Sequence, residues 1–501
     1  MNPTLASLIC ACGIAGLFYL DRDKSVHTSK ALWLPVIWIG IVESRPASAW
    51  LGLSPPGDNV QLEGSPVDAA IFGVLLAAAL VVLIMRRTRT RTFLAANWPI
   101  LIYFVYCLIS VSWSYHPDVA FKRWIKAIGD LAMVLVIVTD GQPVAALRRL
   151  FTRTGFLLLP TSLLFIKYYP ELGRGFTADG DPMNTGVTTN KNTLGVTLLV
   201  ISLGIFWRFL SLMREKSDPD RGRHLAAQGV LLAFGVWLLG ISDSKTAISC
   251  FALGAGLMIA TNLDVIRRRP ARVYALCLAI FLVGGATLLF GGGTGVVQAL
   301  GRKSTLSGRT DIWAAVLPAV PNAIIGAGFE SFWISPAALT VWNTLANAGW
   351  WKPEVLINEA HDGYIEVYLN LGWLGVGLIA AILLSGYRRA VRAFERDPGL
   401  ASLLLGYITV ATVYSITEAG FRMLDPIWVF LLLAIVTASG VAGGFFAKQP
   451  HEISTLPGGE KAGTPHKNKP RPTSAPVYGI RHRSSRFEIV QPMPAATILP
   501  Q

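Results

Sequence analysis

Long apolar segments separated by short polar connections recur along most of the chain. Most of them contain about 17–22 residues, a length that spans the hydrocarbon core of a bilayer as a helix. The pattern therefore predicts an all-α polytopic membrane protein with about 12–13 transmembrane helices. The thirteen segments cover residues 4–20, 31–43, 68–85, 97–114, 125–139, 154–168, 192–212, 225–241, 246–265, 273–290, 364–385, 401–418 and 426–446, and 31–43 is the shortest.

The composition agrees with this class. The 501 residues are 52% hydrophobic and only 15% charged, whereas soluble domains have about 25% charged residues. The five cysteines all lie inside apolar segments without metal-ligand spacing, so they are interpreted as small core residues. The first segment has neither a basic leader nor a cleavage site, which favours a retained span over a signal peptide.

The basic connections predict the orientation of the spans. Lys and Arg concentrate in connections that fall on one side if the spans alternate, and positive loops lie in the cytoplasm. This places the N-terminus outside and the C-terminus inside. These connections cover residues 86–91, 148–153, 214–223, 267–272 and 387–396. Residues 1–446 are predicted to form the transmembrane domain. Residues 447–501, rich in proline and basic residues, are predicted to form a disordered cytoplasmic tail.

The opposite face collects the polar segments that are candidates for chemistry. The longest is 291–361, and loops above about 12–15 residues are uncommon unless they bind or catalyse something. A transporter would carry its ionisable residues near the bilayer midplane, where Asp130 is the clearest candidate here. The clustering outside favours an enzyme that acts on a lipid-linked substrate at the outer surface of the membrane, with 291–361 as its catalytic loop.

His361 is the candidate catalytic residue. It stands just before a predicted span in AHDGYIEVYLNLGWLG, and a helix N-terminus disfavours the imidazolium, so the ring is expected to be neutral. The carboxylates of Glu359 and Asp362 favour the charged imidazolium instead, but they can also orient the ring. A neutral histidine is a suitable general base for a sugar hydroxyl; the alternative is a structural interfacial histidine. No second histidine, cysteine or carboxylate has metal-ligand spacing near it, so no metal is predicted.

Two arginines of the loop are candidates for binding phosphate. Arg309 lies in SGRTDIW, near the start of a predicted short helix through 312–317. A guanidinium makes paired charge-assisted hydrogen bonds to phosphate oxygens. The alternative is an arginine that snorkels at the membrane surface. Arg302 is a second candidate of the same kind.

Further cations lie in two other external segments. In residues 173–195, Asn190 or Asn192 is expected to cap the following helix, while Arg174 and Lys191 add positive charge. The alternative is a turn with a cap and no ligand. Lys245 lies in the very short turn GISDSK, which holds it at the same face.

The order of these motifs resembles the O-antigen ligase and polysaccharide polymerase superfamily. The motifs are an Asn/Lys-rich loop, SDSK, SGRTDIW, GAGFESF and AHDGYIE. The segments SRPASAWLGL, EGSPVD and TTNKNTLG look closer still to the succinoglycan-type exopolysaccharide polymerisation proteins of rhizobia. The resemblance covers roughly residues 31–446 and leaves out the tail.

The resemblance implies a metal-independent, integral-membrane glycosyltransferase with a GT-C-like fold in the bacterial inner membrane. Its donor would be an undecaprenyl-diphosphate-linked glycan at the periplasmic face. His361 resembles the base that deprotonates the acceptor hydroxyl, and Arg309 resembles a pyrophosphate-binding arginine. Lys245 stands where the family commonly has arginine, and Asp362 replaces a frequent asparagine. The implied partners are membrane lipid, a flippase and chain-length or export proteins; no nucleic acid is expected.

The predicted function is polymerisation of lipid-linked repeat units into exopolysaccharide. Ligation of a finished glycan onto lipid A core or another acceptor uses the same chemistry and is the nearest alternative. A glycolipid or polysaccharide transporter and a noncatalytic assembly subunit are alternatives of other classes. The sugar, the linkage and the oligomeric state are not encoded in these motifs.

Overall fold

The structure is a computed structural model that describes residues 2–22, 28–53, 64–177, 180–215, 219–267, 269–289, 309–348 and 357–446. The predicted tail, the first part of the predicted catalytic loop with Arg302, and residues 349–356 lie outside the described residues.

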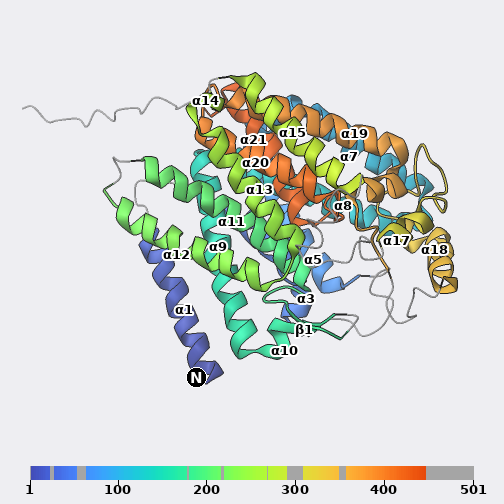
Figure 1. Ribbon diagram of the computed structural model, residues 1–501, viewed down its shortest axis with the longest axis horizontal. Helices are drawn as coiled ribbons and strands as arrows, with labels where there is room; N and C mark the ends of the chain where they lie inside the picture. Colours follow the sequence, from blue (N-terminus) through green and yellow to red (C-terminus); the bar gives the residue numbers. More distant parts are fainter. Residues whose placement is uncertain are drawn as a thin grey trace, which may run out of the picture. The chain divides into compact units, whose positions relative to one another are not determined.

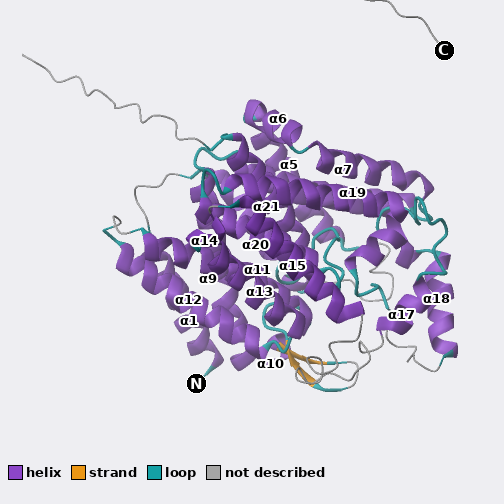
Figure 2. Cartoon of the chain, turned by 45° about the horizontal axis from the view of Figure 1, so that its top comes forward, coloured by secondary structure: helices purple, strands orange, loops and turns teal. Residues whose placement is uncertain are grey.

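The described residues form an all-α protein, as predicted, with one two-stranded antiparallel sheet (Figures 1 and 2). The helices are α1 (Pro3–Leu20), α2 (Trp33–Val42), α3 (Ala47–Trp50), α5 (Pro66–Met85), α6 (Arg87–Ala96), α7 (Trp98–Ser110), α8 (Pro117–Val138), α9 (Pro143–Tyr168), α10 (Pro170–Gly173), α11 (Lys191–Arg214), α12 (Arg221–Ile241), α13 (Lys245–Thr261), α14 (Asp264–Arg267), α15 (Pro270–Leu289), α17 (Arg309–Val316), α18 (Pro336–Asn347), α19 (Gly363–Ala393), α20 (Pro398–Tyr414) and α21 (Pro426–Gly443). The strands are β1 (Arg174–Phe176) and β2 (Pro182–Asn184).

Seven of the described helices are long and apolar enough to cross a membrane, namely α1, α5, α9, α11, α12, α19 and α21. The count becomes eight if α6 and α7, bent by 87° with the 3₁₀ turn that follows α7, form one broken span. Each of the thirteen predicted segments lies on a helix, but the predicted number of spans is higher than this. Several of the others are short; α13 and α20, for example, have 17 residues each.

The central and peripheral helices differ in burial. In its most apolar window, α21 is 89% buried and α11 is 72% buried, whereas α1 is only 6% buried. An apolar helix that stays exposed suits contact with lipid. In both views α1 and α12 lie on the opposite side of the bundle from α17 and α18 (Figures 1 and 2). Helices α11 and α21 therefore form the buried centre of the bundle.

Helix α19 is broken at Gly372, and the GAGF segment pairs with the break. Gly372 has φ 63° and ψ −165°. The backbone N–H of Trp373 donates to the carbonyl of Ala323 at 2.9 Å, and the N–H of Gly328 donates to the carbonyl of Asn370 at 2.8 Å. These bonds satisfy polar groups that a break would otherwise expose to lipid. Through these hydrogen bonds the segment 323–328 is attached directly to α19.

The side chain of Asn370 completes this attachment. Its Oδ1 accepts hydrogen bonds from the N–H groups of Ser331 and Phe332 at 2.8 and 3.0 Å. Its Nδ2 donates to the carbonyl of Glu366 at 2.9 Å. Phe332 then lies in a second apolar core formed mainly by α17, α18 and the turn between them.

Polar segments for which the sequence predicts an external position contact one another at one end of the bundle. Arg45 Nε, after α2, donates to the carbonyl of Thr188 at 3.2 Å. The turn after α20 contacts the predicted loop through Arg309 and Glu418, whose side chains are 2.7 Å apart. This end carries the candidate site.

Candidate active site

The backbone on both sides of His361 is held by buried carboxylates. The N–H of Ala360 donates to Glu366 Oε2 at 3.0 Å. Asp362 caps α19, and its Oδ1 accepts from the N–H groups of Tyr364 and Ile365, both at 2.8 Å. His361 itself has φ 52°, a left-handed conformation that is uncommon for residues other than glycine. Such backbone strain often occurs at functional sites, where the surrounding structure maintains it.

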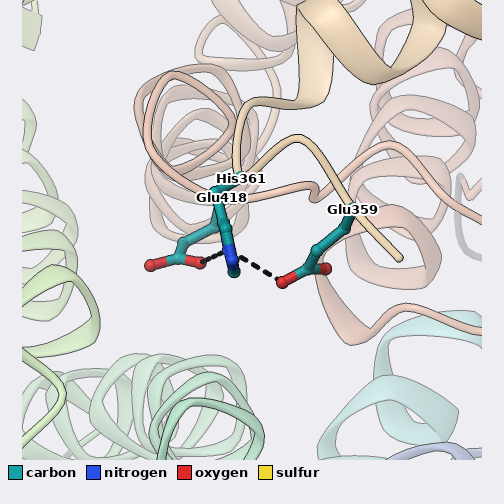
Figure 3. A group of neighbouring side chains, drawn as sticks. All are labelled: Glu359, His361 and Glu418. Carbon is teal, nitrogen blue, oxygen red and sulfur yellow. Dashed lines mark ion pairs between the residues drawn. The ribbon is translucent and has the colours of Figure 1, made fainter. Parts of the chain in front are cut away.

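Six ionisable side chains alternate in sign around His361. We call them the charge chain: Arg309, Glu418, His361, Glu359, Arg422 and Glu330. The successive contacts, from Arg309 to Glu330, are 2.7, 3.6, 2.8, 3.7 and 3.3 Å. Figure 3 shows the imidazole with its Nδ1 directed at both glutamates. The alternation places each charge next to opposite charges, so no member of the charge chain is buried without a counter-charge.

The carboxylates change the expected protonation of His361. Burial lowers the pKa of His361, but hydrogen bonds and charge from Glu359 and Glu418 outweigh burial and raise it to about 9. The expectation of a neutral ring is therefore wrong for this arrangement, because two carboxylates oppose the helix N-terminus. Burial raises the pKa of Glu359, but the hydrogen bond from His361 and the nearby arginines give a net lowering.

The prediction of no metal assumes that no second ligand group lies near His361, and this assumption is also wrong. One ligand atom from each of Glu359, His361 and Glu418 lies within 4.8 Å of the others, and these are metal-ligand types. The sequence does not reveal this because Glu418 comes from the turn after α20. Arg309 and Arg422 already contact the two glutamates and offset their negative charge.

A cavity of about 450 Å³ opens beside the charge chain, a size typical of ligand pockets. It brings two predicted segments together, the start of α11 and the turn that carries His361. Asn190 caps α11, as predicted, and its Oδ1 accepts from the N–H of Thr193 at 2.8 Å. The connection from Tyr414, at the end of α20, to Pro426, at the start of α21, also contributes to its wall. Its lining residues include Val42, Met183, Asn190, Lys191, Asn192, Thr193, Val196, Glu359, His361, Tyr414, Glu418, Ala419, Leu424, Asp425 and Pro426.

Lys191 and Lys245 converge on one carboxylate at the edge of this cavity. Asp243 lies 3.7 Å from Lys191 and 2.8 Å from Lys245. The hydrogen bond from Lys245 and the charges of both lysines lower the pKa of Asp243. Lys191 lines the cavity, and Lys245 shares its carboxylate partner, so the structure places the two predicted cations together.

These lysines are expected to contribute little to folding. The side chain of Asp243 is 61% exposed, and exposed ion pairs contribute roughly 0–1 kcal/mol. Lys191→Gln and Lys245→Gln should therefore each lower the free energy of unfolding by less than about 1 kcal/mol. Thermal unfolding of the purified variants in detergent measures this. A loss of several kcal/mol would make the lysines structural and would remove them as candidates for substrate contact.

The other predicted residues fall into three places. Arg309 is 7% exposed and binds the carbonyl of Thr417 as well as Glu418, so its guanidinium holds the turn after α20 rather than lining the cavity. Arg174 lies on β1 and lines a second cavity. Arg302 lies outside the described residues. Their assignment to substrate binding stays a prediction.

Glu418, Arg422 and Glu330 are the members of the charge chain that sequence reasoning did not assign to the site. Ion pairs join the turn 418–425 to other segments: Arg422 pairs with Glu330 and Glu359, and Glu418 pairs with Arg309. These pairs join segments far apart in sequence, so no local pattern could identify them.

Residues with a left-handed backbone conformation also lie near the charge chain and the first cavity. Among the described residues, the non-glycine positions with positive φ are Asp243, Glu330, His361 and Leu424. The side chains of Asp243, Glu330 and His361 take part in the contacts described above, and Leu424 lines the cavity.

Fold and site together define a polytopic all-α membrane protein with a charged cavity at one end of its helix bundle. The chain is 24% identical over 307 residues to the exopolysaccharide production protein ExoQ of Rhizobium meliloti (strain 1021). The matched stretch covers 59% of this chain and 66% of that protein, just under two thirds of its length. No family model matches the chain. The similarity connects the chain with proteins of exopolysaccharide production.

Proposed function

We propose that the protein polymerises undecaprenyl-diphosphate-linked oligosaccharide repeat units into an exopolysaccharide at the periplasmic face of the inner membrane. The observation that carries the proposal is the cavity shared by His361 and the start of α11, which offers a proton acceptor beside cationic and amide groups. The similarity to an exopolysaccharide production protein supports the substrate class.

In this proposal His361 is the general base. With Glu359 2.8 Å from Nδ1, the neutral ring carries its proton on Nδ1 and accepts on Nε2. The acceptor hydroxyl attacks the anomeric carbon of the donor, its proton passes to Nε2, and the bond from that carbon to the diphosphate breaks. Undecaprenyl diphosphate leaves with the bonding electrons. Lys191, with Lys245 held by the same Asp243, stabilises the departing charge, since fixed cations lower the barrier where negative charge develops.

The pH dependence of elongation tests the protonation of His361. A base with a pKa of about 9 is deprotonated in roughly one molecule in a hundred at pH 7, so the rate should rise about tenfold from pH 7 to pH 8 and level off above pH 9. Glu359→Gln removes the nearest carboxylate and should move this rise to lower pH. The measurement is the initial elongation rate of purified protein on a lipid-linked repeat.

Asp311→Asn is a matched control for this experiment. Asp311 is an exposed acid at the start of α17 and is not a member of the charge chain, so the pH profile should not move. A wild-type profile that levels off near pH 6.5 and does not respond to Glu359→Gln would contradict the coupling between His361 and Glu359 that raises the pKa of the ring.

The products distinguish the alternatives. A polymerase lengthens lipid-linked repeats in detergent solution without a second compartment, which a transporter does not do. A ligase moves a finished glycan onto a different acceptor and leaves single lipid-linked repeats unchanged. Long lipid-linked products from a single defined repeat therefore indicate polymerisation.

A further inference from the structure

A second cavity of about 600 Å³ lies beside the β1–β2 hairpin. It is formed by the ends of α9 and α12 together with the hairpin. Its lining residues include Leu163, Ile166, Lys167, Tyr168, Arg174, Asn184, Trp237 and Ile241. These comprise two cations, an amide and several apolar groups, with no carboxylate.

The hairpin separates the two cavities. Met183 lines the first cavity, and its neighbour Asn184 lines the second. Successive side chains of a strand point to opposite faces, which explains this division. Arg174 pairs with Asn184 across the strands and therefore shares its face. One short hairpin thus forms a wall between two cavities at the same end of the bundle.

Arg174 is held in position with part of its guanidinium available. Its Nε donates to the carbonyl of Ile166 at 2.8 Å. Within the described residues its two terminal nitrogens have no hydrogen-bond or ion-pair partner, and the side chain is exposed. Lys167 lines the same cavity and lies over the Tyr168 ring at 5.6 Å. The two cations complement a phosphate group.

The apolar part of the cavity suits a lipid chain. Trp237 is 52% exposed, and it lies one helical turn before Ile241 on α12. Leu163 and Ile166 provide the facing apolar surface on α9. Tryptophan and tyrosine are enriched where membrane proteins meet the lipid headgroups. Cations beside an exposed apolar wall are the arrangement that an anionic lipid requires.

We propose that this second cavity binds the polyprenyl diphosphate of the acceptor substrate. The inference rests on the proposed function, in which both substrates carry a lipid diphosphate. The donor's diphosphate is attached to the reacting carbon and must lie close to His361. The acceptor reacts through a hydroxyl at the other end of its repeat, so its diphosphate must lie away from His361. A cationic, apolar cavity behind the hairpin wall meets this requirement.

Binding stoichiometry tests the inference without reference to activity. Native mass spectrometry of the purified protein with undecaprenyl diphosphate should show two bound molecules per chain. Lys167→Gln combined with Arg174→Gln should weaken one of the two at least about tenfold, because charge-assisted hydrogen bonds are lost. Lys122→Gln is the matched control; its side chain is 63% exposed, it pairs with Asp118, and it lines neither cavity. Two molecules bound with unchanged affinity in the double variant would overturn the inference.

Competition identifies the lipid. Phosphatidylglycerol at equal concentration should not displace the second undecaprenyl diphosphate. Displacement would overturn the proposal and make the cavity a site for ordinary anionic headgroups.

Activity with two acceptors separates this inference from the proposed function. The double variant should lose at least about tenfold in transfer onto a lipid-linked repeat but keep transfer onto the same repeat in water-soluble form, because only the former uses the second cavity. Equal loss with both acceptors would overturn the acceptor assignment. If the wild type elongates neither acceptor, the proposed function fails, and the binding stoichiometry still decides whether a second lipid-diphosphate site exists.

Discussion

His361→Ala is expected to slow elongation of lipid-linked repeats about 10²- to 10⁴-fold, the usual contribution of a general base. The physical reason is that His361 is the titratable side chain of the cavity that combines partial exposure with a carboxylate 2.8 Å from its Nδ1, an arrangement that fixes the tautomer. The substitution would also remove the positive charge that lies between the carboxylates of Glu359 and Glu418, so its effect on folding must be measured separately. The measurement is the elongation rate of purified protein, together with polymer length in a complemented deletion strain.

Two controls separate catalysis from folding in this variant. His116→Ala removes a histidine that lies outside both the charge chain and the cavity, so it should retain wild-type activity. His361→Gln keeps a hydrogen-bonding side chain but cannot accept the proton, so it should stay as inactive as His361→Ala while unfolding nearer to the wild type. Normal long-chain polymer from His361→Ala at normal protein levels would contradict the role.

Gly372→Ala is expected to lower the free energy of unfolding by about 4 kcal/mol or more, through backbone strain and a direct clash. A Cβ at Gly372 would lie 2.2 Å from the carbonyl carbon and oxygen of Ile324. Its φ of 63° with ψ of −165° is unfavourable for alanine in any case. Moving Ile324 would break the hydrogen bond that its carbonyl accepts from the N–H of Leu374 and disturb the neighbouring bond from Trp373 to Ala323. These bonds attach the segment to α19.

Gly377→Ala is the matched control in the same helix. A Cβ at Gly377 meets nothing within 4 Å, so alanine should be neutral or slightly stabilising there. Thermal unfolding in detergent measures both variants. Equal stability of Gly372→Ala and the wild type would show that the break in α19 is not required by the fold.

The sequence predicts the helices well because the apolar pattern depends on local composition. It does not predict the break in α19, since LNLGWLG lies inside one predicted span and the break is stabilised by the distant segment 323–328. Seven or eight of the described helices are long and apolar enough to cross a membrane, whereas others such as α2, with 10 residues, are too short to cross a bilayer alone.

The sequence predicts only part of the candidate site, because only some of its residues belong to local motifs. His361, Asn190 and Lys191 were identified from local motifs, and the structure places them around one cavity. Glu418 belongs to none of these motifs, yet it contacts both His361 and Arg309. Its effect on the pKa of His361 depends on tertiary packing. Sequence reasoning therefore identified the candidate base and Glu359, but not Glu418, which also raises the pKa of the ring.

The central claim is that the cavity beside His361 joins lipid-linked repeats. Its most direct test is incubation of the purified protein, free of other membrane proteins, with one defined undecaprenyl-diphosphate-linked repeat. The account predicts a ladder of longer lipid-linked products from the wild type and at least a hundredfold less from His361→Ala. No ladder from folded wild-type protein, or the same ladder from both proteins, would contradict it.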